Sequence, residues 1–173
     1  QVRAFVRSNK DDAADARALW IAAHQSDIRR VPIKGIEQQA VQALHRTRQH
    51  WISVRTATIN ALRGLLYEFG VVLPGGKQVG LKALSVRRAQ IDAQVPAPMQ
   101  RLIDGQLAML KDITQRVDQL EAEIAALGKA HATESRLRQV PGIGLLGASA
   151  RAATLGDARG WKSGREFSAS LGI

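Results

Sequence analysis

MQRLIDGQLAMLKDITQRVDQLEAEIAAL, residues 99–127, is the stretch with the clearest periodic pattern in the chain. Apolar residues recur along it at alternating spacings of three and four, and charged residues stand between them. This spacing places the apolar side chains on one stripe of an α-helix and is typical of a coiled-coil seam. One column of the seam comprises Ile103, Leu110, Val117 and Ile124, and the other comprises Ile113, Leu120 and Leu127. The stretch therefore predicts a long helix that packs against another helix and ends at Gly128.

A second long helix is expected at 36–69, a segment that contains no proline and whose only internal glycine is Gly64. Its apolar residues form a broad stripe with one column that recurs every seven residues, as expected for the buried side of a helix. The column comprises Leu44, Trp51, Thr58 and Leu65, and the stripe also includes Val54, Ala61, Leu62, Leu66 and Phe69. Trp51 is therefore interpreted as a core residue rather than as a platform for nucleic-acid bases. The two long helices can pair as a hairpin within one chain or as a coiled coil between chains, and the pattern favours neither.

Glycine and proline residues mark the boundaries between these helices. Gly70 is expected to end the first helix, and Pro74-Gly75-Gly76 predicts a turn. A shorter helix is predicted at 82–93, and Pro96 and Pro98 are expected to break the chain after it. The sequence thus predicts a mainly α-helical chain.

Residues 11–25 predict a further helix, because aspartates favour the start of a helix and alanines favour its interior. Asp11 is the expected capping residue. Asp12 and Asp15 are three residues apart and share one helical face, where paired carboxylates suit Mg²⁺ or Mn²⁺ in a two-metal site. The same spacing also arises from the simple preference of acids for the positive end of the helix dipole. The pair is a candidate metal and catalytic site with fewer acids than such sites usually contain.

The composition of the chain favours an anionic partner. Its 173 residues include 25 Lys and Arg against 15 Asp and Glu, which gives a formal net charge of +10 and a pI of about 11.0. Nucleic acid is the commonest partner of a protein this basic. The absence of cysteine excludes disulfides and thiolate metal sites and is consistent with a reducing cytoplasm. No run of 18 apolar residues occurs, so no membrane-spanning helix is expected.

Positive charge is concentrated between residues 29 and 63, where seven basic residues accompany a single acid. Arginine offers a planar fork of donors to phosphate, so this helix is predicted to follow a nucleic-acid backbone. The candidate binding residues here are Arg46, Arg48, Arg55 and Arg63. The alternative is an ordinary solvated face, which the scarcity of acids makes the weaker interpretation. His45 and His50 lack the third ligand that a zinc site needs.

The segment LRQVPGIG, residues 137–144, combines a Gly-apolar-Gly turn with an alanine-rich helix that follows it. This pattern is typical of a helix-hairpin-helix, in which the glycines permit a tight turn and the next helix offers free N–H groups to a phosphate. Arg138, Gly142 and Gly144 are therefore further candidates for nucleic-acid binding. A purely structural turn is the alternative.

Three segments carry a resemblance to a known family. They are VRAFVRSNKDDAADARAL (residues 2–19), QQAVQALHRTRQHWISVRTATINALRGLLYEFG (38–70) and LRQVPGIGLLGASARAATLGDARGWKSGREFSASLGI (137–173), and together they cover about half of the chain. They resemble, in the same order, the DEDD-type transposases of the insertion-sequence 110 family, including its 1111 branch. The resemblance implies an enzyme that binds DNA and catalyses the strand cleavage and joining of an insertion sequence.

The resemblance also implies a division of the chain and a set of catalytic residues. Residues 1–30 would be the C-terminal end of a RuvC-like α/β catalytic domain with a four-acid site, 31–132 a helical coiled-coil region, and 133–173 the start of a C-terminal transposase domain. Asp12 and Asp15 match the last two acids of that site. In place of the family's usual threonine the chain has aspartate at position 11.

Other parts of the catalytic machinery are expected outside the sequence. The first two acids would precede residue 1 and a nucleophilic serine would follow residue 173, so both edges look cut from a longer protein. Ser163, Ser168 and Ser170 lie before the expected place and are not interpreted as the nucleophile. Both catalytic centres would be incomplete here, and we expect no strand transfer from this chain alone.

The resemblance further implies Mg²⁺ or Mn²⁺ as cofactor, DNA and a structured guide RNA as partners, and a homo-oligomer formed through the helical region. It also implies a location in the bacterial cytoplasm at the nucleoid. Two other functions fit the residues. One is a non-catalytic nucleic-acid-binding protein with a helix-hairpin-helix module, and the other is a plain coiled-coil oligomerisation module. A salt titration separates them, because phosphate-driven binding weakens steeply with ionic strength and coiled-coil assembly does not.

Overall fold

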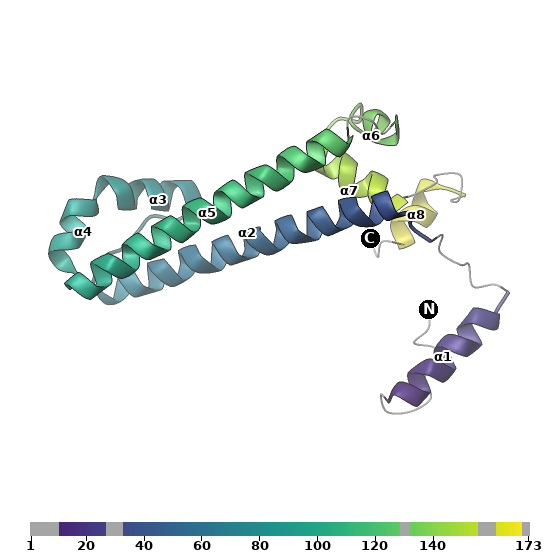
Figure 1. Cartoon of the computed structure of the whole chain (residues 1–173), viewed down its shortest axis with the longest axis horizontal. Coiled ribbons are helices and arrows are strands. Elements are labelled where there is room, and N and C mark those ends of the chain that lie inside the picture. Colours follow the sequence, from purple (N-terminus) through teal and green to yellow (C-terminus); the bar gives the residue numbers. More distant parts are fainter. Residues whose placement is uncertain (1–10, 27–32, 129–131, 156–161, 171–173) are drawn as a thin grey trace. The chain divides into compact units, whose positions relative to one another are not determined.

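The computed structural model describes residues 11–26, 33–128, 132–155 and 162–170, and the regular structure in these ranges is entirely helical (Figure 1). The chain divides into two compact units, Gln1–Lys34 and Gly35–Ile173. No helix in the described ranges is both long and apolar enough to cross a membrane. The prediction of a mainly α chain is confirmed for these ranges.

The first unit contains α1, Asp12–His24, which agrees within one residue at each end with the predicted helix at 11–25. Asp11 adopts an extended conformation at the N-cap position, and alanines fill much of the helix behind it. Ala18 and Ala22, one turn apart, are buried, whereas Trp20 is 64% exposed. The helix forms where capping and propensity both favour it.

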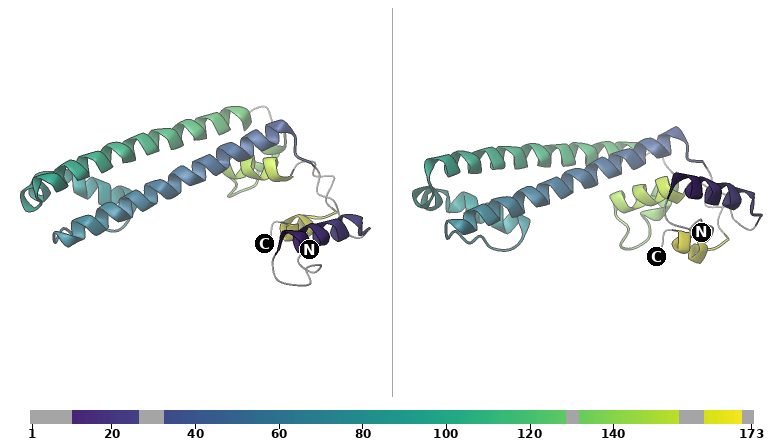
Figure 2. Two further views of the ribbon diagram at one scale, coloured as in Figure 1. Left: turned by 60° about the horizontal axis from the view of Figure 1, so that its bottom comes forward. Right: turned by 90° about the horizontal axis from the view of Figure 1, so that it is seen from below.

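The second unit is built on two long helices, α2 (Ile36–Glu68) and α5 (Ala97–Gly128), which run antiparallel and side by side (Figures 1 and 2). The two helices therefore pair within the chain as a hairpin. The buried residues of α5 are Met99, Ile103, Leu110, Ile113, Val117 and Ile124. Five of the seven predicted seam residues are thus buried, whereas Leu120 is half-buried and Leu127 at the end is 48% exposed.

The apolar stripe predicted for α2 is only partly right. Thr58 and Leu62 are buried as expected, but Leu65 is 38% exposed and Ala61 is exposed as well. A straight α-helix has about 3.6 residues per turn. A column of residues spaced seven apart therefore drifts by about 20° per heptad around the helix surface. Over the three heptads from Leu44 to Leu65 the column leaves the interface, and Leu66 takes its place in the core.

The far end of the hairpin is closed by two short helices rather than by the single one predicted at 82–93. They are α3 (Lys77–Val86) and α4 (Arg88–Gln94), and the helix breaks at Arg87, which is neither glycine nor proline. Their apolar side chains complete one core cluster with the two long helices. Its buried members are Leu62, Leu66, Val71, Leu84, Ile91, Val95, Met99 and Ile103.

Gly70 and Pro96 interrupt the helices as predicted, whereas Pro98 does not. Gly70 ends α2 with a φ of 72°, as expected for a glycine at this position. Pro98, however, falls in the first turn of α5, where its missing N–H has no helical partner to lose. The long helix thus begins at Ala97 rather than beyond the second proline.

The near end of the hairpin carries α6 (Ala132–Leu137) and α7 (Leu145–Leu155), and α8 (Gly164–Ser170) follows later in the chain. α7 packs against α2, α5 and α6. Ala148 and Ala153 are buried at this junction, because small side chains let α7 approach the long helices closely. The segment after the glycine turn is therefore packed on the hairpin.

Candidate functional site

The acidic pair lies in the first turn of α1. The Oδ1 atom of Asp11 accepts a hydrogen bond from the backbone N–H of Ala14 at 2.7 Å, which confirms Asp11 as the cap. Asp12 is exposed and Asp15 is half-buried. Since Asp11 is engaged at the helix end, Asp12 and Asp15 are the carboxylates of this turn that remain available to a cation.

The chemistry of this pair fits a hard divalent cation, but two carboxylates make an incomplete set of ligands. Mg²⁺ prefers oxygen ligands in octahedral geometry, and carboxylates meet that preference. In the ranges that the structure describes, no group of three or more His, Cys, Asp or Glu side chains could hold a metal ion. A metal site built on Asp12 and Asp15 therefore needs ligands from other residues.

Arg46 and Arg55 are the arginines of α2 that are open to an outside partner. Arg46 is exposed and Arg55 is half-buried, and neither makes a hydrogen bond or ion pair with another residue in the described part of the chain. A guanidinium with no internal partner can bind phosphate without first breaking a contact. These two residues are the best placed of the predicted binding arginines on α2.

Arg48 and Arg63 have partners within the hairpin. The Nη2 atom of Arg48 lies 2.7 Å from the Oε1 atom of Glu121 on α5, across the helix pair. Arg63 donates through Nη2 to the backbone carbonyls of Pro74 and Gly76, and so fastens the loop after α2. The scarcity of acids on 29–63 is thus offset at Arg48 by an acid of α5.

A row of polar contacts fixes α7 to α2, and sequence reasoning did not find it. Gln42 donates through Nε2 to the carbonyl of Ala153 at 3.1 Å. One turn later the Nε2 atom of His45 lies 3.1 Å from the Oγ atom of buried Ser149. Burial and, secondly, the positive charge of Arg48 lower the pKa of His45. His45 is therefore a packing residue at this junction, and its place there is consistent with the interpretation that it is not a zinc ligand.

The lowered pKa of His45 predicts a loss of stability in acid. Between that pKa and the ordinary value of 6.5 the unfolded chain binds a proton at this position that the folded chain does not. The free energy of unfolding should therefore fall as the pH drops through this window, and the penalty should be absent above it. Urea unfolding at a series of pH values between 8 and 5 measures the effect.

His45→Gln is the matched variant for this test, because glutamine can still bond to Ser149 but does not titrate. We expect its unfolding free energy to depend less on pH than that of the natural sequence. Equal pH dependence of His45→Gln and the natural chain would contradict the assignment.

The glycine turn joins α6 to α7, which pack against each other. Gly142 has a φ of 86°, a conformation that other residues rarely adopt. Gly144 directly precedes α7, and its carbonyl accepts the N–H of Ala148 at 2.9 Å. Arg138 in the turn is exposed. The first N–H groups of α7 have no partner within the helix, and the turn that precedes them carries an exposed arginine.

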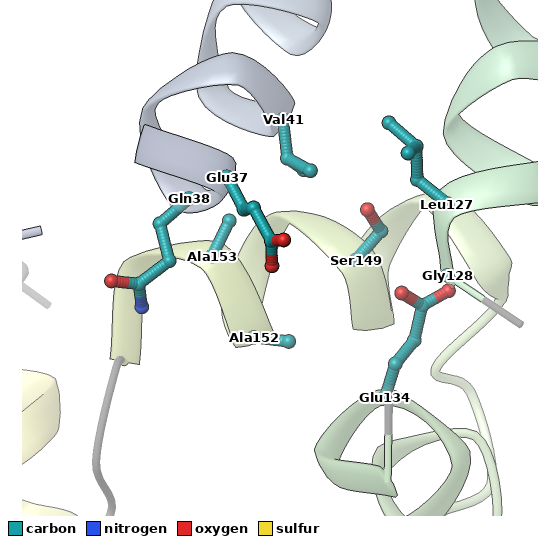
Figure 3. Close-up of a pocket in the computed structure, with 9 residues that line it drawn as sticks. All are labelled: Glu37, Gln38, Val41, Leu127, Gly128, Glu134, Ser149, Ala152 and Ala153. Atoms are coloured by element: carbon teal, nitrogen blue, oxygen red, sulfur yellow. The ribbon is translucent and has the colours of Figure 1, made fainter. Parts of the chain in front are cut away.

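A small pocket lies where α2, α5, α6 and α7 meet, and its chemistry does not suit phosphate (Figure 3). The carboxylates of Glu37 and Glu134 both point into it. Glu134 is almost completely buried. Because two carboxylates repel an anion, this pocket is not a candidate phosphate site.

Comparison with known proteins finds the whole chain within a group of transposases. It is 41% identical over 173 residues to a "Probable family 20 transposase" of Pseudomonas aeruginosa, an alignment that covers 99% of this chain and 51% of that protein. It is 33% identical over 172 residues to the "Transposase for insertion sequence element IS1111A" of Coxiella burnetii, which covers 99% and 47% respectively. A third relative is the "Transposase for insertion sequence element IS1328" of Yersinia enterocolitica, 32% identical over 172 residues.

Over nearly its whole length the chain is similar to transposases of the insertion-sequence 110/1111 family. It spans about half the length of the curated relatives it matches. No protein-family model matches it, and no solved structure does. Three segments of the sequence indicated a resemblance to this family. The alignments extend that resemblance over nearly the whole chain.

Proposed function

We propose that this chain is part of an enzyme that cleaves and joins the DNA strands of an insertion sequence. The observation that carries the proposal is the match to transposases over 99% of the chain. The strong positive charge supports it, because such an enzyme has to hold DNA throughout its reaction. Strand transfer is proposed for the whole protein, and we expect no strand transfer by these 173 residues alone.

We assign the metal-binding and catalytic role to Asp12 and Asp15. In this proposal they are two of the four acids of a RuvC-like site, and other parts of the enzyme supply the remaining ligands. Two Mg²⁺ or Mn²⁺ ions bound there would stabilise the attacking and leaving oxygens of a phosphodiester. The capping bond of Asp11 supports the assignment, since with Asp11 in that role the carboxylates of Asp12 and Asp15 are left available in the first turn of α1.

We assign the nucleic-acid contacts of the second unit to Arg46 and Arg55 on α2 and to the turn formed by Arg138, Gly142 and Gly144. Arg48 and Arg63 are better assigned to the stability of the hairpin, because both are already bonded within it. The division into a catalytic end, a helical region and the start of a C-terminal domain stays a prediction about the whole protein.

The remaining partners are a structured guide RNA and further copies of the protein. The basic charge supports an RNA partner as well as DNA. Leu102 and Met109, seven residues apart on α5, are 39% and 45% exposed and are suitable for contact with another helix. An intermolecular contact through the hairpin would add to the intramolecular pairing of α2 and α5.

A salt titration tests the nucleic-acid surface. Replacing Arg46 and Arg55 together with alanine should weaken the binding of duplex DNA and reduce the slope of log K against log salt by about two, one for each phosphate contact. Filter binding or fluorescence polarisation between 50 and 200 mM salt measures the slope. The matched control replaces Arg101 and Lys111 with alanine. This change removes the same amount of positive charge from exposed positions of α5. Equal slopes for the two double variants would contradict the assignment to α2.

A further inference from the structure

An open surface groove runs between α2 and α5 beside Trp51. It is lined by Thr47 and Trp51 from α2, and by Arg116, Gln119, Leu120 and Glu123 among the residues of α5. Trp51 was expected in the core, but in the structure its ring is half-buried and forms part of this surface. The groove is therefore a place where an aromatic ring, apolar side chains and hydrogen-bonding groups meet.

We propose that Trp51 is a stacking platform for an unpaired nucleobase. The inference rests on the nucleic-acid binding proposed above and names a site and a ligand class for it, which is single-stranded nucleic acid. Aromatic side chains bind bases of any sequence because every base has a π-face. A base within a duplex is already stacked on both sides, so the ligand has to be a single strand or an unpaired loop.

The surroundings of the ring suit this ligand. The guanidinium carbon of Arg116 lies 5.2 Å from the centre of the Trp51 ring, and the imidazole of His50 meets the indole at 5.4 Å between ring centres. The ion pair of Arg116 with Asp112 has side chains 50% and 57% exposed, so it holds Arg116 weakly. The guanidinium can move aside and stack on the other face of an incoming base.

Groups that neighbour Trp51 along α2 and in the groove match the rest of a nucleotide. Arg55 follows Trp51 by one helical turn and has no hydrogen-bonded or ion-paired partner in the described ranges, so it is free to bind the attached phosphate. Thr47, Gln119 and Glu123 offer donors and acceptors for the edge of a base. Trp51 would thus stack on the base of a nucleotide, and Arg55, one turn along the helix, would bind its phosphate.

The test compares two ligands that differ only in their bases. A fluorescently labelled oligothymidylate and an abasic strand of the same length have the same phosphates, and their affinities for the 173-residue chain are measured by polarisation. We expect the thymidylate to bind about 5- to 150-fold more tightly, the range for stacking of a base on an aromatic side chain. Trp51→Leu should remove most of this preference, and Trp51→Phe should keep most of it.

Two controls separate stacking from loss of the fold. Trp20→Leu removes the exposed tryptophan of α1 and should leave the preference unchanged. Circular dichroism confirms that each variant keeps its helices, and if Trp51→Leu unfolds, the two ligands still test the proposal on the natural chain. Equal affinity of the natural chain for both ligands overturns the platform while leaving phosphate binding in place. A preference that survives in folded Trp51→Leu also overturns it, and failure to bind any nucleic acid contradicts the proposed function as well.

Discussion

Alanine at position 12 or 15 is expected to reduce DNA strand transfer by a full-length transposase carrying this segment by about 100- to 1,000-fold or more. This is the scale of losing one group that stabilises developing charge in a transition state, and a metal ligand acts on such charge directly. Transposition of a marked element, or joining of labelled DNA ends in vitro with Mg²⁺, measures the loss. Asp12→Asn should fail in the same way, because an amide nearly keeps the size of the carboxylate but not its charge.

Asp11→Ala is the matched control for this prediction. It removes a neighbouring carboxylate whose role in the structure is to accept the N–H of Ala14. Loss of such a cap costs about 1 kcal/mol of stability, which leaves a folded enzyme with nearly unchanged strand transfer. A full-length protein that stays active without both Asp12 and Asp15 would rule out the metal site and favour a non-catalytic role for α1.

The long helices could be predicted well because their signal is local and repeated. Four heptad positions of α5, from Ile103 to Ile124, are all buried, as a periodic pattern of that length indicates. The pattern does not indicate whether the partner helix belongs to the same chain, and the packing of α2 on α5 answers that question. The break at Arg87 had no signal in the sequence, since it lies in a run without glycine or proline.

The candidate site was predicted less completely, because its contacts join residues far apart in the sequence. Asp11 could be recognised as a cap since it is three residues from its partner. The contacts of His45 with Ser149 and of Arg48 with Glu121 span 104 and 73 residues. In the sequence, the charge of Arg48 suggested that it binds the phosphate of an external partner. In the structure it faces α5 and pairs with the carboxylate of Glu121. Only the folded structure shows that Arg48 has a partner within the hairpin and that Arg55 has none in the described ranges.

The hairpin core offers the largest predicted effect on stability. Ile103 is fully buried where α5 meets the cluster that includes Leu62 and Leu84, so no solvent can fill the space that a smaller side chain leaves. Ile103→Ala is expected to lower the free energy of unfolding by about 2–5 kcal/mol, the usual result of removing a buried isoleucine side chain. For a domain of this size the thermal midpoint should fall by roughly 4–20 °C.

Leu102→Ala is the control, because the neighbouring side chain on the same helix is 39% exposed. Both substitutions place alanine in the middle of a helix, where it is the most favourable residue, so helix propensity does not explain a difference between them. Leu102→Ala should lower the unfolding free energy by clearly less than Ile103→Ala, since part of the Leu102 side chain is already in water. Calorimetry or urea unfolding of both variants measures the difference. Similar losses for both would mean that α5 does not present Ile103 to the hairpin core in solution, and the pairing of α2 with α5 would have to be revised.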